Sequence, residues 1–126
     1  MGWSLARIAS SLAWTDNQSR QELANLTPIA FPTAFAFAAV ANSLSLSTAL
    51  AAFCFNWAEN QVTAALRTVP LGQESGQRLL QRVRPTIPKV VEKTICVGRD
   101  GIVAFAPMLA ILSSRHETQA FRLFRS

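Results

Sequence analysis

The residues with the chemistry to bind a metal ion are few and far apart. The chain of 126 residues contains one histidine, His116, and two cysteines, Cys54 and Cys96. They lack the Cys-x-x-Cys and His-x-x-x-His spacings that bring two ligands to one metal ion. We therefore predict no metal site and no cofactor, although a transient or intersubunit metal contact at His116 or a cysteine stays open. Cys54 lies among aromatic residues, which favours a small core residue.

Motifs for catalysis are missing as well. The Gly72–Gly76 segment has two glycines but lacks the Gly-Lys-Ser/Thr sequence that completes a phosphate-binding loop. There is no Gly-x-Ser-x-Gly nucleophile elbow. The glutamates are scattered singly, so that folding would have to assemble any pair of carboxylates. We predict that the chain is not an enzyme.

The charge distribution favours a binding role. Charged residues make up 15% of the chain, against roughly 25% in an average domain. Residues 64–126 carry ten basic and four acidic residues, whereas residues 1–63 carry two and three. Ten of the twelve basic residues are arginine, which forms planar, bidentate contacts with carboxylates and phosphates. An acidic protein surface, a nucleic acid and solvent alone are all open as the surroundings of this basic half.

Apolar periodicity predicts helices and no convincing strand. We expect helices over residues 3–14, 28–42, 48–68 and 75–84, then to about residue 95, and a short one from Pro107. Asp16–Ser19 is expected to form a loop. Thr27 and Ser47 should cap the helices that follow them, and Pro85 and Pro88 should kink or restart the chain.

The segment 48–68 is apolar on nearly all sides, which is typical of a central helix surrounded by others. Asn56 and Asn60 would then be buried, and we interpret them as a hydrogen-bonded core network in preference to a polar seam between subunits. The predicted fold class is all-α, a helical bundle around this central apolar helix. We expect a single helical domain over residues 1–126.

The stretch Leu23–Ala58 has no charged residue, yet we predict that it does not cross a membrane. Prolines, serines and an asparagine break it, so that no clean run of about 20 strongly apolar residues remains. A buried helical hairpin explains this stretch better. The first residues lack the basic and apolar regions of a secretory signal, so we expect a cytoplasmic protein with free thiols.

Two long motifs follow each other in the second part of the chain. The first comprises Phe55–Ala65 (FNWAENQVTAA), Val69–Gln73 (VPLGQ) and Gly76–Leu80 (GQRLL). The second comprises Phe105–Pro107 (FAP), Ser114–Gln119 (SRHETQ) and Arg122–Ser126 (RLFRS). Together they resemble the UreF family of urease accessory proteins. The resemblance covers roughly the whole chain and is weakest before Thr27 and around residues 95–102.

The resemblance implies a cytoplasmic assembly chaperone that is all-helical and not an enzyme. Members of the family join a second accessory protein, UreD (UreH in some organisms), and the GTPase UreG. The complex delivers nickel to the urease apoprotein. A homodimer is a further expectation. Because family members are roughly twice as long, the resemblance also implies an incomplete version of the UreF fold, without its N-terminal helices.

The resemblance further implies where partners bind. The family's C-terminal tail docks onto the UreD-type partner, and its residues here are Arg115, His116, Glu117, Gln119, Arg122, Leu123, Phe124 and Arg125. Exposed Phe, Leu and Arg side chains are suited to anchor an interface. A second patch, expected near the dimer or GTPase surface, is the turn of Pro70, Gly72, Gln73 and Gln77. This leading hypothesis includes no nucleic acid and no membrane. The alternative is a small basic helical module that binds nucleic acid or a membrane surface.

Overall fold

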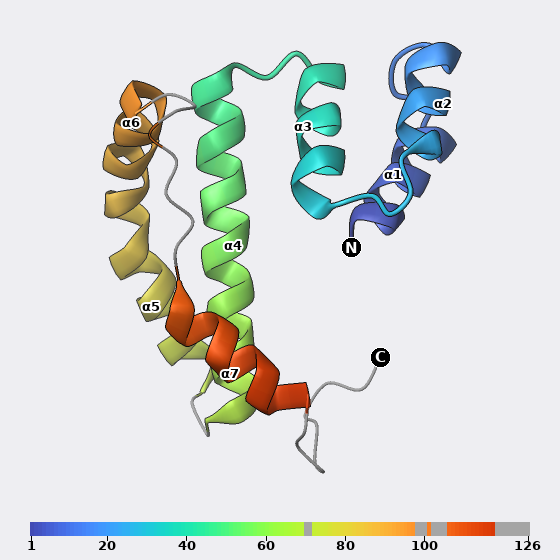
Figure 1. Ribbon diagram of the computed structural model, residues 1–126. Coiled ribbons are helices and arrows are strands. Elements are labelled where there is room, and N and C mark those ends of the chain that lie inside the picture. Colours follow the sequence, from blue (N-terminus) through green and yellow to red (C-terminus); the bar gives the residue numbers. More distant parts are fainter. Residues whose placement is uncertain (70–71, 98–100, 102–105, 118–126) are drawn as a thin grey trace.

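The computed structural model describes residues 1–69, 72–97, 101 and 106–117, and within them it contains helices and no strand (Figure 1). The helices are α1 (Gly2–Ser11), α2 (Asn17–Asn25), α3 (Phe31–Ala41), α4 (Leu46–Thr68), α5 (Gln73–Val83), the short 3-10 helix η1 (Arg84–Thr86), α6 (Ile87–Val97) and α7 (Pro107–Glu117). The all-α prediction is confirmed. No helix of the described residues is both long and apolar enough to cross a bilayer.

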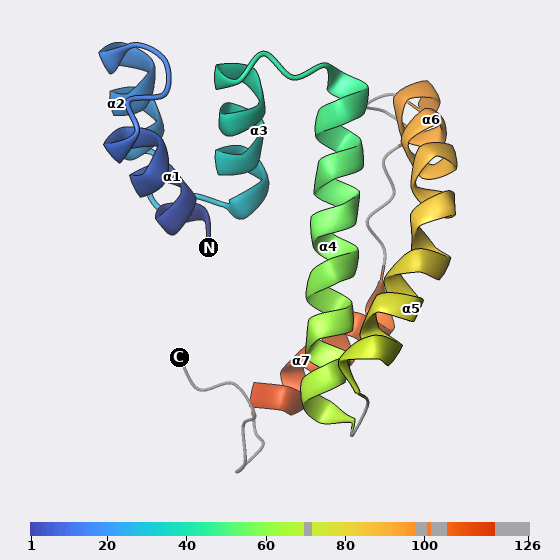
Figure 2. The ribbon, with the colours of Figure 1, turned by 180° about the vertical axis from the view of Figure 1, so that it is seen from behind.

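The helices form two groups that meet between α3 and α4 (Figures 1 and 2). In the first group, α1 packs against α2 and α3. In the second group, α4 packs against both α5 and α6. Helices α5 and α6 continue each other through η1, where the backbone stays helical, and we call Gln73–Val97 the α5–α6 rod. Helix α4 thus lies between α3 and this rod.

Helix α2 occupies a segment for which the sequence analysis expected a loop. The Asp16 carboxylate accepts a hydrogen bond from the backbone N–H of Ser19 at 2.9 Å and another from its hydroxyl at 2.8 Å. The loop prediction for Asp16–Ser19 is therefore wrong. An aspartate that binds the free N–H groups of a first turn stabilises a helix even where the sequence is polar.

Two predicted caps are also wrong, because neighbouring residues take their place. Thr27 lies before α3, whose N-cap is Ala30. Ser47 lies within the first turn of α4, where Ser45 is the N-cap and its hydroxyl accepts a hydrogen bond from the N–H of Thr48 at 3.2 Å. The starts of α3 and α4 therefore differ by two or three residues from their predictions.

Prolines mark two helix boundaries correctly. Pro85 lies in η1 and Pro88 in the first turn of α6, so the predicted restart is confirmed. Pro107 opens α7 as expected. A proline fits a first helical turn, where its missing N–H has no partner to lose.

Three phenylalanines join the two groups. Phe31 and Phe35 project from α3, and their ring centroids lie 6.0 and 5.3 Å from that of Phe53 on α4. The two α3 rings are 5.9 Å apart. Rings at these distances attract one another beyond the area that they bury. This cluster fixes α3 against α4.

Helix α4 is central in position but it is not enclosed. Ala58 is its one buried residue in the described part of the chain, and the side chain of Trp57 is 61% exposed. Asn60 is exposed and Asn56 is half-buried. No side-chain hydrogen bond joins either amide to another described residue. The predicted core network is therefore wrong, because α3 and the rod leave part of α4 open.

Candidate protein-binding surface

The predicted tail site falls mostly beyond the described residues. Arg115 is exposed on α7, and His116 and Glu117 form the last turn of this helix, where only their backbone is described. The other predicted tail contacts lie outside the described residues, namely Gln119, Arg122, Leu123, Phe124 and Arg125.

The predicted turn site lies at one end of the α4–α5 hairpin. Gly72 is the N-cap of α5, and Gln73 and Gln77 are exposed on its first two turns. Pro70 lies outside the described residues. A Cβ atom added to Gly72 would meet nothing within 4 Å. The described part of the turn is therefore an open surface, available to another molecule.

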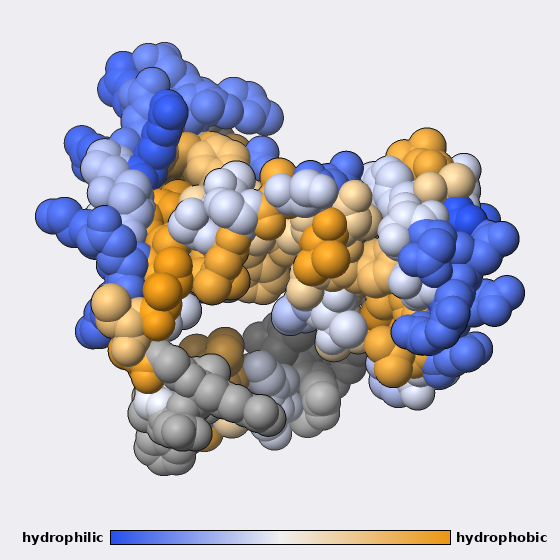
Figure 3. Space-filling model, turned by 90° about the horizontal axis from the view of Figure 1, so that it is seen from above, coloured by the Kyte–Doolittle hydropathy of each residue, from blue (hydrophilic) through white to orange (hydrophobic). Residues whose placement is uncertain are grey.

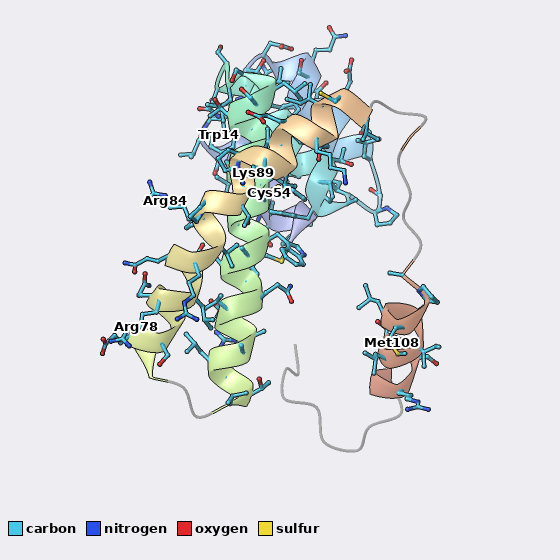
Figure 4. The ribbon with its side chains drawn as sticks, turned by 90° about the vertical axis from the view of Figure 1, so that its left-hand side faces the viewer. Trp14, Cys54, Arg78, Arg84, Lys89 and Met108 are labelled. Carbon is cyan, nitrogen blue, oxygen red and sulfur yellow. The ribbon has the colours of Figure 1, made fainter. Side chains whose placement is uncertain are left out.

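The structure does not bring the two predicted sites together. Figure 4 shows α7, marked by Met108, separated from the end of the hairpin that carries Arg78. Helix α7 also makes no extensive contact with any other described helix. Its apolar side chains are correspondingly exposed, including that of Leu109, which is 66% exposed. An apolar helix in this position offers a surface for a partner to cover.

A third surface, which the sequence analysis missed, runs between α4 and the α5–α6 rod. We call it the Trp57 groove. Its volume is about 200 Å³, and its lining is almost entirely apolar: Phe53, Cys54, Trp57, Ala58, Val83, Thr86, Ile87 and Val90. Val83 is 38% exposed and Val90 is 48% exposed. Their spacing of seven residues was the signal for a continuous apolar stripe along one face.

Cys54 has a different environment from the one predicted. Its side chain is half-buried and lines the Trp57 groove, whereas a core residue would be enclosed. Cys96 is exposed near the end of α6. Within the described residues, no three side chains of the types His, Cys, Asp and Glu converge on a common point where a metal ion would fit.

Two further hollows flank α3. One, of about 240 Å³, lies between α3 and α4 and includes Phe35, Leu50 and Phe53. The other, of about 570 Å³, lies between α2 and α3 and mixes Thr15, Ser19 and Glu22 with apolar residues. Figure 3 shows apolar side chains over the middle of the molecule and hydrophilic ones at its two ends. On this face, apolar surface thus lies over the middle of the molecule.

The rod is the basic element of the described structure. It carries five basic and two acidic residues, a net charge of +3. One of its arginines, Arg78, forms an ion pair with Glu74 at 2.6 Å, with both side chains more than 70% exposed. Basic side chains along an apolar groove attract partners that combine apolar and acidic groups.

The one large pKa shift among the described groups belongs to the helix cap and not to these surfaces. The backbone N–H and then the hydroxyl of Ser19 stabilise the Asp16 carboxylate and lower its pKa from 3.8 to about 2. A hydrogen-bonded cap in an exposed turn explains the shift without any catalytic role. The described geometry therefore favours binding over acid–base chemistry.

Comparison with known protein families identifies the family of the chain. The UreF family profile matches residues 1–84, which run from the start of α1 into η1. The match covers two thirds of the chain, includes the first of the two motifs and ends before the second. No solved structure shows a significant match. From the extent of the profile match, the chain belongs to the UreF family, a family of urease accessory proteins.

Proposed function

We propose that the chain assists urease maturation by holding other proteins together. In this role it joins a UreD/UreH-type accessory protein and a UreG-type GTPase in the cytoplasm, and it helps insert nickel into the urease apoprotein. It does so without catalysis and without a cofactor of its own. The family match over residues 1–84 is the observation that carries this proposal.

Helix α7 and the residues after it are the proposed contact with the UreD-type partner. Helix α7 stands apart from the other helices, and Met108, Leu109, Ile111 and Leu112 on it are all about half exposed or more. Covering such side chains provides association energy of roughly 25 cal/mol for each Å² of apolar surface removed from water. Arg115 is exposed on the same helix, and the sequence that follows contains Arg122, Leu123 and Phe124, which are suited to anchor an interface.

The turn at the end of the α4–α5 hairpin is the proposed second contact, toward the GTPase or a second copy of the chain. Gly72, Gln73 and Gln77 lie exposed there, well away from α7. Two separated surfaces suit a protein that holds two partners at once. In this arrangement the partners supply the ligands for nickel, and the chain sets their relative position.

Co-purification tests this proposal. We expect a tagged full-length chain to retain a co-expressed UreD-type protein, and removal of residues 117–126 to reduce retention about tenfold or more, as loss of an anchor cluster does. Leu109→Asp should weaken retention on its own because it charges the apolar face of α7. Val40→Asp is the matched control, since Val40 is 79% exposed on α3, which lies apart from α7 (Figure 1).

Retention that is unchanged by the deletion would show that the tail is not the contact. Salt separates the proposal from the alternative of a basic module. An apolar interface should survive an increase in salt, whereas binding to nucleic acid weakens steeply. A complex that contains nucleic acid and dissociates as the salt concentration rises would contradict the proposed role.

A further inference from the structure

We propose that the Trp57 groove binds an amphipathic helix of a partner protein whose apolar face is flanked by carboxylates. The inference rests on the proposed function, because it names the chemistry of the partner segment that one surface accepts. It concerns a surface formed by α4 and the rod and does not depend on the tail.

The shape of the groove fits a helix. Along the rod, exposed apolar side chains recur at Leu79, Val83, Val90 and Val97, with spacings of four, seven and seven residues. Such a stripe lines up with the i, i+4 and i+7 side chains of a second helix laid along it. Trp57 rises from α4 on the facing side of the groove and is 61% exposed. A half-exposed tryptophan beside an apolar hollow is a favourable anchor point for a partner.

The charge of the rim fits carboxylates. Arg82 and Lys89 lie four residues before and three residues after the groove residue Thr86, and Arg84 lies three residues before the groove residue Ile87. Residues three or four apart are neighbours on a helix surface, so these cations lie beside the groove. No ion pair engages these three cations within the described part of the chain. Figure 4 shows Arg84 projecting outward from the rod on the same side as Arg78. Cations without counter-charges beside an apolar floor favour an acidic, apolar occupant over a purely apolar one.

The chain's own apolar helices do not provide such an occupant. Helices α1 and α3 contain no acidic residue, and α7 has none from Pro107 to Arg115. A second copy would bring its own basic rod and a net charge of +5, so that like charges would meet at the groove. We therefore place the complementary carboxylates on a different protein.

Binding of a synthetic helix tests the inference on the full chain. The probe is a fluorescein-labelled peptide with leucines at i, i+3, i+4 and i+7 and glutamates on both flanks, and its control has lysines in place of the glutamates. We expect the glutamate peptide to bind at least about tenfold more tightly by fluorescence anisotropy. Equal affinity for the two peptides, or no binding of either, would overturn the inference.

Matched variants locate the bound peptide. Val90→Asp places a negative charge in the groove and should weaken binding of the glutamate peptide about tenfold or more. Val40→Asp makes the same exchange at an exposed valine on α3 and should leave binding unchanged. Equal losses from the two variants would overturn the assignment to the groove.

The cysteines provide a second measurement on the unaltered chain. Bound peptide should slow alkylation of Cys54, which lines the groove, while the exposed Cys96 keeps its rate. Unchanged alkylation of Cys54 under saturating peptide would contradict the inference. So would displacement of the peptide by a single-stranded oligonucleotide, which would assign the groove to nucleic acid.

The two proposals fail separately. Absence of peptide binding with normal retention of the UreD-type protein overturns the groove inference alone. Loss of that retention with normal peptide binding overturns the proposed function alone.

Discussion

The group formed by α1, α2 and α3 and the group formed by α4 and the α5–α6 rod are both helical, but they differ in which side chains lie between their helices. In the first group the buried positions are almost all glycine or alanine: Gly2, Ala6, Ala9, Ala34 and Ala39, with Leu23 beside them. In the second, large apolar side chains such as Trp57 and Val90 line a groove and remain about half exposed. Residues 1–41, which form the first group, carry two basic and two acidic side chains, whereas α4 and the rod together have a net charge of +3.

The difference shows how side-chain size decides what a helix pair leaves open. Small residues let backbones approach, so that a Cβ atom added to Gly2 would overlap the carbonyl oxygen of Ile29 and lie 2.8 Å from the backbone of Ala30. Between α4 and the rod, the larger side chains of Phe53, Trp57 and Val90 border the Trp57 groove. We therefore assign the closest backbone approach to the first group and the proposed binding of a partner helix to the second.

Phe53→Ala should have the largest effect, because it removes the contact between the two groups. We expect the free energy of unfolding to fall by about 2–3 kcal/mol, since the variant loses both α3 rings as neighbours. Phe55→Ala is the matched control on the same helix; Phe55 is 40% exposed and should cost less than about 1 kcal/mol. Urea denaturation monitored by circular dichroism measures both. Equal losses would mean that the ring cluster does not join the groups.

Gly2→Ala and Gly76→Ala compare the packing of the two groups directly. At Gly2 the new methyl meets backbone, which yields little, so we expect a loss of about 2 kcal/mol. At Gly76 it meets the Cδ1 atom of Leu66 at 2.7 Å, the end of a flexible side chain. The better helix propensity of alanine, about 1 kcal/mol, should then make this variant neutral or slightly more stable. A reversed order of melting temperatures would contradict the comparison.

Acid should weaken the first group through Asp16. Its pKa is about 2 in the folded chain against 3.8 as the ordinary value, so folding favours the ionised form. The stabilisation is present above about pH 4 and is lost as the pH falls toward 2. Asp16→Asn keeps a hydrogen-bond acceptor but does not titrate, so we expect a flatter pH dependence of the urea midpoint over this range. An identical pH profile for the two proteins would show that the cap does not act through its charge.

Glu74→Gln should have the smallest effect. It breaks the ion pair with Arg78, which is exposed at 72% and 79% and joins neighbouring turns of α5. We expect a change in unfolding free energy of less than about 0.5 kcal/mol. The same variant adds one unit of positive charge to the rod, so it should tighten binding of the glutamate peptide slightly, measured by anisotropy at low salt. Weaker peptide binding would argue against an electrostatic contribution from the rod.

Much of the fold was predictable, and most of the candidate surface was not. Apolar periodicity predicted helices in preference to strands, and Pro85, Pro88 and Pro107 marked helix boundaries correctly. The error at Asp16 came from treating polarity as evidence for a loop when the aspartate itself was the start signal. The error at Asn56 and Asn60 came from assuming that an apolar helix is covered on all sides. The predicted contacts at Gly72, Gln73 and Gln77 are exposed, and their role in binding stays a prediction.

Local chemistry in the sequence determines where the helices of this protein begin, because capping and proline effects act within three or four residues. Family membership is likewise written in the sequence of residues 1–84. Only the tertiary structure decides which apolar side chains remain open, such as Trp57 and Val90, because exposure depends on residues that are distant in the chain. A helix carries its apolar face in its own sequence, but the size and placement of its neighbours determine whether that face becomes core or a binding surface.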